Sequence, residues 1–288
     1  MTYICIATTP TTHIFKLPIG LVGGRRADFR TSVDNEWLRM KLLQAYGLPT
    51  ANVEIATFGQ QRVLNVERFD RRLAASGETL LRLMQEDFCQ ATGTSPLLKY
   101  ESDGGPGLKQ IFPILQQSAK AQEDMRNFMA SQILFWMLRA TDGHAKNFSI
   151  QLLAGAASRF HLTPVYDVMS AYPAMGAGPN QWADQEVKLA MALQGKSRHY
   201  QMHTILRRHF SSTAKLLGYG ADAEELVREL IEKTPSAIEQ VHRQIPAGFS
   251  QQVVDSVLAG LSKAAQQLAA QAPKAVSRQR VSEGGKGD

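Results

Sequence analysis

Hydrophobic and polar residues follow two different periods in this chain, and the change comes near residue 72. Short runs rich in β-branched and aromatic residues dominate before this point, and apolar residues three or four positions apart dominate after it. The first part predicts strands at 3–6, 13–17, 52–56 and 62–66 and a helix at 32–46. The Gly- and Arg-rich segment 20–30, which precedes the helix, is typical of a loop.

The second part is predicted to be mainly helical. Its apolar spacing predicts helices at 76–92, 106–117, 121–140, 199–217, 222–244 and 248–270. A hairpin of two strands, at 148–153 and 159–163, is expected between the third and fourth helices. We therefore predict an α+β fold with a small β lobe at 1–70, a larger helical lobe at 71–270 and a disordered tail at 271–288.

Composition is that of an ordinary globular protein, with 44% apolar and 20% charged residues in 288. Cys5 and Cys89 are far apart and belong to no metal-binding or disulfide pattern. No apolar run approaches membrane-spanning length and no signal peptide is evident, so we expect a cytoplasmic protein without membrane contact. The formal net charge of +6 would suit ATP or nucleic acid, but uneven charge on a soluble protein is the favoured interpretation.

The strongest chemical signal lies at residues 141–150. Asp142 and Asn147, five positions apart, combine a carboxylate that can activate a hydroxyl with an amide that can ligate Mg²⁺, as phosphoryl transfer requires. Asp167 ends the predicted hairpin region and would bring a second metal ligand near Asn147. The alternative is a helix C-terminal turn in which Asp142 and Asn147 cap backbone groups.

Lys16, in the predicted strand 13–17, can supply a cation for nucleotide phosphates. Its apolar neighbours indicate a half-buried strand with the ammonium in a cleft, and Glu36 is the natural ion-pair partner. A water-exposed lysine on an edge strand, and a glutamate favoured by the helix dipole, are the ordinary alternatives. The end of strand 62–66 could meet the edge of an adenine, although a plain strand end with ordinary charges remains the alternative.

Three other features of the chain are less specific. His144 is interpreted as a residue that structures the loop or contacts a nucleotide. Lys146 either neutralises a transferred phosphoryl group or is solvated. The glycine-rich run 100–107 follows no strand, as a phosphate loop would, so we expect a tight turn before a helix at the rim of the site.

In combination these motifs resemble the C-terminal kinase portion of the HipA family, the serine/threonine kinase toxins of bacterial toxin–antitoxin modules. The segments that carry the resemblance, in order, are 10–20, 32–36, 66–72, 85–90, 99–107, 140–149, 162–170 and 188–191. The resemblance implies a protein-kinase-like bilobal fold and an activity that uses ATP and Mg²⁺.

Residue by residue, the resemblance implies that Asp142 is the catalytic base and that Asn147 and Asp167 hold Mg²⁺. Lys16 would contact the phosphates of ATP, and residues 67–69 would form the hinge beside the adenine. The complete set of implied nucleotide-binding residues is Lys16, Glu67, Arg68, Phe69, His144, Ala145, Lys146, Asn147, Tyr166 and Asp167.

The resemblance also implies partners. Such kinases phosphorylate an aminoacyl-tRNA synthetase, typically the glutamyl enzyme, to arrest translation, and a helix-turn-helix antitoxin that also binds operator DNA restrains them. They carry a glycine-rich phosphate loop ahead of the lysine, and because this chain begins about fifteen residues before Lys16, an N-terminally truncated kinase portion is expected. The alternatives are an impaired remnant that binds antitoxin or DNA, and a kinase for a small molecule.

Overall fold

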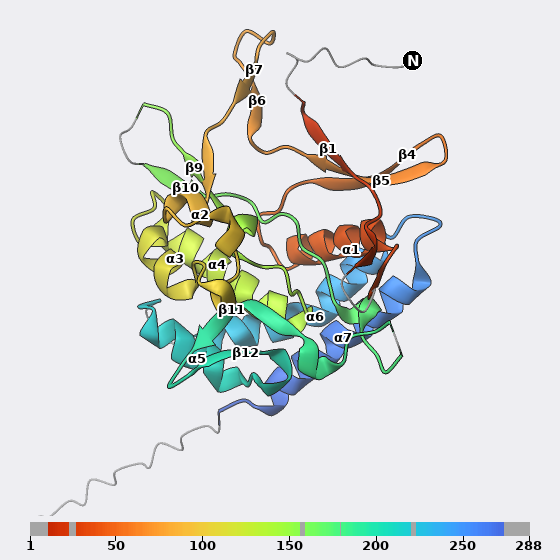
Figure 1. The fold of residues 1–288 in the computed structure, drawn as a ribbon, viewed down its shortest axis with the longest axis vertical. Helices are drawn as coiled ribbons and strands as arrows, with labels where there is room; N and C mark the ends of the chain where they lie inside the picture. The colour runs from red at the N-terminus through yellow and green to blue at the C-terminus, as the bar shows by residue number, and fades with distance from the viewer. Residues whose placement is uncertain (1–10, 23–26, 156–158, 179, 220–222, 274–288) are drawn as a thin grey trace, which may run out of the picture.

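A small β-rich part stands above a larger helical part in the computed structural model (Figure 1). The structure describes residues 11–22, 27–155, 159–178, 180–219 and 223–273. The predicted α+β class and the bilobal arrangement are confirmed.

Three antiparallel strands form the first sheet, in the order β1-β5-β4. These strands are β1 (His13–Lys16), β4 (Val53–Phe58) and β5 (Gln61–Glu67). Helix α1 (Ser32–Ala45) packs against β4 and β5 and buries their inward-facing side chains. The opposite face stays open, because Phe15 and Phe58 are exposed there with their ring centroids 5.0 Å apart.

Most of the helical part is built around α4 (Ala121–Met137). The other helices are α2 (Phe88–Ala91), α3 (Leu108–Leu115), α5 (Arg207–Leu216), α6 (Glu224–His242) and α7 (Gln251–Ala270). Helices α6 and α7 pack on each other, and both also contact α1 and α4. The expected helices at 106–117, 121–140, 222–244 and 248–270 are therefore confirmed, with slightly shorter bounds.

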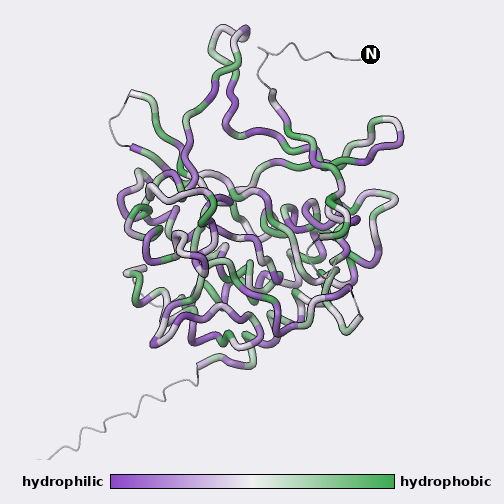
Figure 2. The backbone as a smooth tube through the Cα atoms, viewed as in Figure 1, coloured by the Kyte–Doolittle hydropathy of each residue, from purple (hydrophilic) through white to green (hydrophobic). Residues whose placement is uncertain are grey.

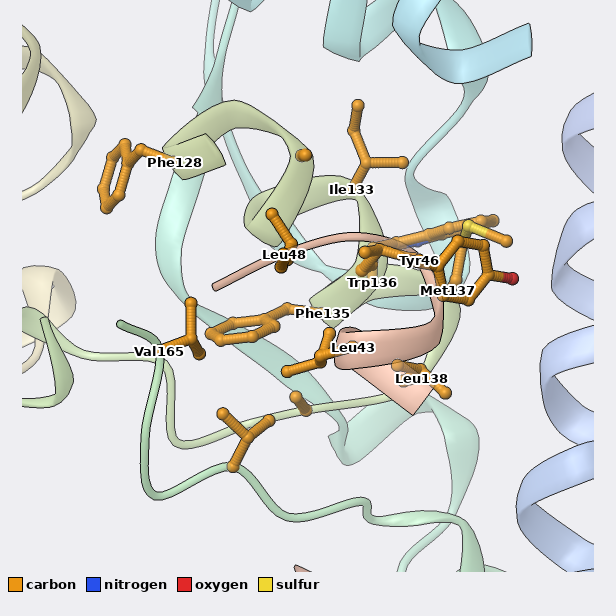
Figure 3. Packing of buried hydrophobic residues seen from close by; sticks show 14 of the residues in the cluster. Leu43, Tyr46, Leu48, Phe128, Ile133, Phe135, Trp136, Met137, Leu138 and Val165 are labelled. Atoms are coloured by element: carbon orange, nitrogen blue, oxygen red, sulfur yellow. The ribbon is translucent and has the colours of Figure 1, made fainter. Parts of the chain in front are cut away.

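The core holds the end of α4 firmly, where the candidate catalytic loop begins. Figure 3 shows Phe135 of α4 surrounded by Leu43, Leu48 and Val165, which come from distant parts of the chain. Burial of one such apolar side chain contributes about 1.5–3 kcal/mol. Figure 2 shows hydrophobic and hydrophilic residues interspersed along the chain in both the β-rich and the helical parts.

The remaining strands form small antiparallel sheets. Their bounds are β2 (Gly20–Val22), β3 (Ala27–Phe29), β6 (Arg71–Leu73), β7 (Leu80–Arg82), β8 (Gln85–Asp87), β9 (Ser149–Leu152), β10 (Phe160–Leu162), β11 (Lys188–Gln194) and β12 (Arg198–Gln201). Strand β9 lies between β8 and β10, and the other six form the pairs β2–β3, β6–β7 and β11–β12. The hairpin β9–β10, predicted from the sequence, is confirmed.

The helix expected at 76–92 is wrong for most of its length. Strands β7 and β8 occupy this segment, and only the single turn of α2 at its end is helical. Leu80 pairs instead with Leu73 across a turn in which Gly77 has a φ of 77°. Backbone pairing between two segments overrides the helical spacing of the leucines, because the spacing carries no information about a partner strand.

Two other expectations need correction, and two lie outside the described residues. The segment 20–30, expected as a loop, contains the hairpin β2–β3, in which Gly20 pairs with Phe29. The helix expected at 199–217 begins with strand β12, and α5 starts only at Arg207. The expected strand at 3–6 and nearly all of the predicted tail are not among the described residues.

None of the helices in the described part of the chain is long and apolar enough to span a lipid bilayer.

Candidate active site

Lys16 bridges two carboxylates at the junction of the β-rich and helical parts. Its Nζ lies 2.6 Å from Oε1 of Glu36 and 2.7 Å from Oδ1 of Asp167. Lys16 is the last residue of β1, and Glu36 lies on the buried side of α1 with 5% of its surface exposed. The ion pair expected between Lys16 and Glu36 is present, and Asp167 joins it.

These three charges perturb one another. Burial raises the pKa of Glu36 to about 7, since desolvation outweighs the attraction of Lys16 and the charge of Asp167 adds repulsion. Burial also works to lower the pKa of Lys16, but the two carboxylates outweigh it and that pKa is raised. The two shifts have different main causes, since desolvation dominates for Glu36 and the two neighbouring carboxylates dominate for Lys16. A further cation would relieve this excess of negative charge.

Asp167 is held in an uncommon backbone conformation. Its φ of 57° lies in the left-handed region, which costs a non-glycine residue about 1–3 kcal/mol. Contacts on both sides fix the segment, since the Val165 amide donates to the Pro49 carbonyl at 2.8 Å. The Asn35 side chain exchanges two hydrogen bonds with the Ser170 backbone, at 2.8 and 2.9 Å. The strain is therefore supported by the surrounding fold and aims the carboxylate at Lys16.

Asn147 connects the two candidate acids. It belongs to the 3₁₀ turn Ala145–Asn147, and its Nδ2 donates to the backbone oxygen of Asp142 at 2.7 Å and to that of Asp167 at 3.4 Å. The amide nitrogen is therefore used within the loop, and the amide oxygen is left for another partner.

Tyr100 and His144 meet at the carboxylate of Asp142. The Tyr100 hydroxyl donates a hydrogen bond to Oδ1 of Asp142, and Nε2 of His144 lies 3.4 Å from the same oxygen. The rings of Tyr100 and His144 contact edge to face, with centroids 5.0 Å apart. Burial lowers the pKa of His144, more than the attraction of Asp142 raises it, so the imidazole is neutral at neutral pH. The Asp142 side chain keeps 37% of its surface exposed and is accessible to an acceptor.

The glycine-rich run places Tyr100 beside Asp142. Buried Glu101 accepts a hydrogen bond from the Ala192 amide at 2.7 Å, which anchors the turn on β11. A Cβ at Gly107 would lie 2.7 Å from Oε1 of Glu101, and Gly104 has a φ of 99°. Glycine is thus required for close packing and for a left-handed turn. The expected turn before a helix is what the structure contains.

Tyr166 fixes the second half of the candidate catalytic loop. Its hydroxyl lies 2.7 Å from the Ser149 hydroxyl and donates to the Lys146 carbonyl at 2.9 Å. Burial raises the pKa of Tyr166, so the phenol keeps its proton. The Phe69 ring packs against Tyr166 with a centroid distance of 5.6 Å.

Lys146 forms an ion pair with Asp87 at 2.7 Å. This is a third role for the lysine, beside the two that were considered from the sequence, neutralisation of a phosphoryl group and solvation.

Of the predicted hinge residues, Phe69 contacts this cluster through its ring packing on Tyr166. The Glu67 amide donates to Asn52, and the guanidinium of Arg68 binds both carboxylate oxygens of Asp70 at 2.9 Å. The partners in these hydrogen bonds, Asn52 and Asp70, are not among the candidate site residues. Their role beside an adenine stays a prediction.

Sequence reasoning missed two contacts of the loop. Tyr100 was expected only at the rim of the site, although its hydroxyl donates a hydrogen bond to Asp142. Asp87 was not considered as the partner of Lys146. Asp87 gives no distinct signal, because its capping of α2 fully explains an aspartate there. Tyr100 is the first residue of the glycine-rich run 100–107, and this turn is the local indication in the sequence that its position is fixed.

The donor atoms suit Mg²⁺ that arrives with a nucleotide. Within the described ranges, no group of three or more His, Cys, Asp or Glu side chains is arranged to hold a metal ion. Mg²⁺ is usually bound by one or two protein carboxylates together with substrate phosphates, and does not need an all-protein cage. The amide oxygen of Asn147 and the free carboxylate oxygen of Asp167 are hard ligands of this kind.

Known proteins resemble the chain over most of its length. Residues 3–239 match the HipA-like C-terminal domain. The protein Y4mE of Sinorhizobium fredii, which carries a kinase name, is 39% identical over 166 residues, covering 57% of this chain and 37% of Y4mE. The serine/threonine-protein kinase toxin HipA of Shewanella oneidensis is 29% identical over 253 residues, covering 83% of this chain and 53% of HipA. The chain thus spans about half or less of the length of these relatives.

Solved structures share the fold. HipA of Shewanella oneidensis, in a complex with HipB and its operator DNA, superposes with a TM-score of 0.74 at 23% identity, over 91% of this chain and 60% of that one. The proinflammatory kinase CtkA of Helicobacter pylori gives a TM-score of 0.58 at 11% identity, over 90% and 88% of the two chains. The kinase-like fold implied by the motifs is confirmed, and the chain belongs to the HipA-like C-terminal domain family.

Proposed function

We propose that this chain is the catalytic portion of an ATP- and Mg²⁺-dependent serine/threonine protein kinase toxin. One observation carries the proposal: a cation, a partly exposed carboxylate and two metal-type ligands meet at one place although Lys16 and Asp167 are 151 positions apart. Phosphoryl transfer consists mainly of positioning and charge neutralisation, and this is what such a set supplies. The kinase names of the two relatives support the same activity.

Each residue has a role in this reaction. Lys16 neutralises phosphate oxygens, with Glu36 orienting its ammonium. Asn147 and Asp167 would hold Mg²⁺, and the ion would neutralise charge on the phosphates. Asp142 accepts the proton of a serine or threonine hydroxyl while the hydroxyl oxygen bonds to the γ-phosphorus, and the bond from that phosphorus to the β–γ bridging oxygen breaks to release ADP.

The nucleotide base would lie between the two parts of the chain. Phe69 and Tyr166 supply aromatic surface, and the backbone at Glu67 and Arg68 would face the adenine edge. Ala145 is fully buried at the start of the 3₁₀ turn, and a small residue there lets the turn pack closely. His144 remains neutral. Its ring packs against the ring of Tyr100, and the Tyr100 hydroxyl holds Asp142 in position by a hydrogen bond.

Membership of the family suggests the wider role. We propose a cytoplasmic toxin whose target is an aminoacyl-tRNA synthetase, of the glutamyl type, so that phosphorylation arrests translation. The Shewanella structure contains HipB and operator DNA, and on this basis a helix-turn-helix antitoxin and, through it, operator DNA are proposed as partners.

Radiolabelled phosphate transfer tests the proposal. The purified chain, with ATP and Mg²⁺, is incubated with individual aminoacyl-tRNA synthetases, and the Asp142→Asn variant serves as the matched negative control. Transfer to the glutamyl enzyme that Asp142→Asn lacks is the expected result. Absence of both ATP binding and transfer, with antitoxin binding retained, would favour the alternative of an impaired remnant that binds antitoxin or DNA.

A further inference from the structure

A pocket of about 530 Å³ opens beside the candidate catalytic carboxylate. Tyr100, which bonds to Asp142, and Thr141, which precedes it in the chain, both line this pocket. Neither Lys16 nor Asp167 contributes to the lining, so the pocket lies beside the phosphate-binding residues and is not part of their site. Ligand pockets commonly measure about 300–1,000 Å³, so the space is large enough for a specific ligand group.

The lining is mainly apolar, with opposite charges at two positions. The buried residues Val187, Leu189 and Ala190, from β11 and the position before it, belong to the lining, and Trp182 is half-buried. The Trp182 ring packs on Phe29 with a centroid distance of 5.5 Å, which fixes it in place. The walls are therefore rigid and suited to a hydrophobic group.

Lys188 and Glu186 also line the pocket, one basic and one acidic. Lys188 is exposed, and Glu186 accepts a hydrogen bond from the Ala183 amide at 2.9 Å. Charges of both signs do not select an acidic or a basic ligand. The ligand group that matches this lining is an apolar side chain whose own backbone is polar.

We infer that this pocket binds a large apolar side chain of the protein substrate, close in sequence to the serine or threonine that accepts phosphate. The inference rests on the proposed kinase activity and names the substrate feature that the same site selects. The acceptor hydroxyl must come within hydrogen-bond reach of Asp142. An extended segment advances about 3.3 Å per residue, so a residue one or two positions from the acceptor reaches a pocket that shares Tyr100 with that carboxylate.

Desolvation gives the pocket its selectivity. A charged or polar side chain would lose hydration against Val187 and Leu189, and beside both Lys188 and Glu186 a charge of either sign would meet repulsion as well as attraction. A leucine or phenylalanine would gain from burial, and the usual value of such burial corresponds to roughly tenfold to hundredfold in affinity.

Peptides that contain one serine and vary the residues around it provide the test. Binding is measured by fluorescence anisotropy with Mg²⁺ and a non-hydrolysable ATP analogue, and phosphate transfer is measured separately with ATP. Peptides with Leu, Phe or Trp at one position near the serine should bind about tenfold more tightly than those with Asp, Lys or Gly there.

A Ser102→Trp variant narrows the pocket from its exposed side. Ser102 is exposed, and within the described part of the chain its hydroxyl makes one hydrogen bond, to Asp103 at 3.1 Å. The substitution should abolish the preference for an apolar residue and raise the KM for peptide about tenfold, with the KM for ATP unchanged. Ser236→Trp, at an exposed serine of α6, is the matched control and should behave as the wild type.

The outcomes separate the two proposals. Peptides that do not bind, bind without an apolar preference, or keep that preference in Ser102→Trp would overturn the inference. Selective binding that Ser102→Trp abolishes, without any phosphate transfer, would support the pocket assignment and refute the kinase activity.

Discussion

The ammonium of Lys16 lies 2.7 Å from Oδ1 of Asp167, although 151 positions separate the two residues. The contact joins the edge of the N-terminal sheet to the segment after β10, and Glu36 of α1 completes it from a third element. Lys16 is partly buried and loses hydration, although the rest of β1 is exposed and not half-buried as the sequence predicted, and two carboxylates compensate for that loss. The position of the Lys16 ammonium is thus fixed by long-range contacts.

Replacement of Lys16 by methionine should remove most phosphate transfer. Methionine keeps the length and apolar stem of lysine but provides no charge for the phosphates, and loss of one such electrostatic group typically costs about 10²–10³ in kcat. Single-turnover transfer from ATP measures the effect. Lys109→Met, at an exposed position of α3, is the control and should retain activity. Equal activity of the two variants would contradict the assigned role of Lys16.

Asp142→Asn should separate binding from chemistry. The asparagine can still accept a hydrogen bond from Tyr100 but cannot take up a proton, and general-base catalysis contributes about 10²–10⁴-fold. We expect transfer to fall in this range while calorimetry with Mg²⁺ and ATP shows an unchanged affinity. The control is Asp255→Asn on the exposed side of α7. A parallel loss of ATP affinity would place Asp142 in the nucleotide site instead.

The sequence was most informative where residues that act together are close in the chain. Asp142 and Asn147 share one loop, and Asn147 donates to the Asp142 backbone, which is the backbone capping that the alternative interpretation expected. The long helices α4, α6 and α7 were also predictable, because a period sustained over several turns admits no strand.

Contacts that join distant segments could not be predicted in the same way. The leucines of 80–83 fit a helix as well as a strand, and only the pairing of Leu80 with Leu73 decides between them. The hydrogen bond from Tyr100 to Asp142 spans 42 positions and depends on where buried Glu101 anchors the glycine turn. Neither partner of such a contact shows a local pattern that indicates the other.

Glu36 should make the stability of the protein depend on pH. Its pKa rises from the ordinary value of 4.5 to about 7 in the folded protein. A carboxyl whose pKa is raised by folding stabilises the fold below its unfolded pKa, and this contribution is lost as the pH rises through the folded value. The free energy of unfolding of the wild type, relative to Glu36→Gln, should therefore fall by about 3 kcal/mol between pH 4.5 and 7.5.

Urea unfolding at several pH values measures this difference, since other titrating groups cancel between the two proteins. Glu54→Gln replaces an exposed glutamate of β4 and should follow the wild type at every pH. A constant difference between wild type and Glu36→Gln would show that Glu36 stays ionised throughout this range.

Gly143 should be intolerant of even one added methyl group. Its backbone lies outside the left-handed region, so the conformation is open to alanine, but a Cβ would lie 2.5 Å from Cε2 of Phe135. Phe135 cannot retreat, because Leu43, Leu48 and Val165 surround it (Figure 3). Gly143→Ala should therefore cost about 1–3 kcal/mol in the free energy of unfolding. Phe135→Leu frees space at the same point. The free energy of unfolding of the double variant should therefore be about 0.5–3 kcal/mol higher than the two single losses, added together, predict. Strict additivity of the two losses in urea unfolding would mean that the ring and the loop are not in contact.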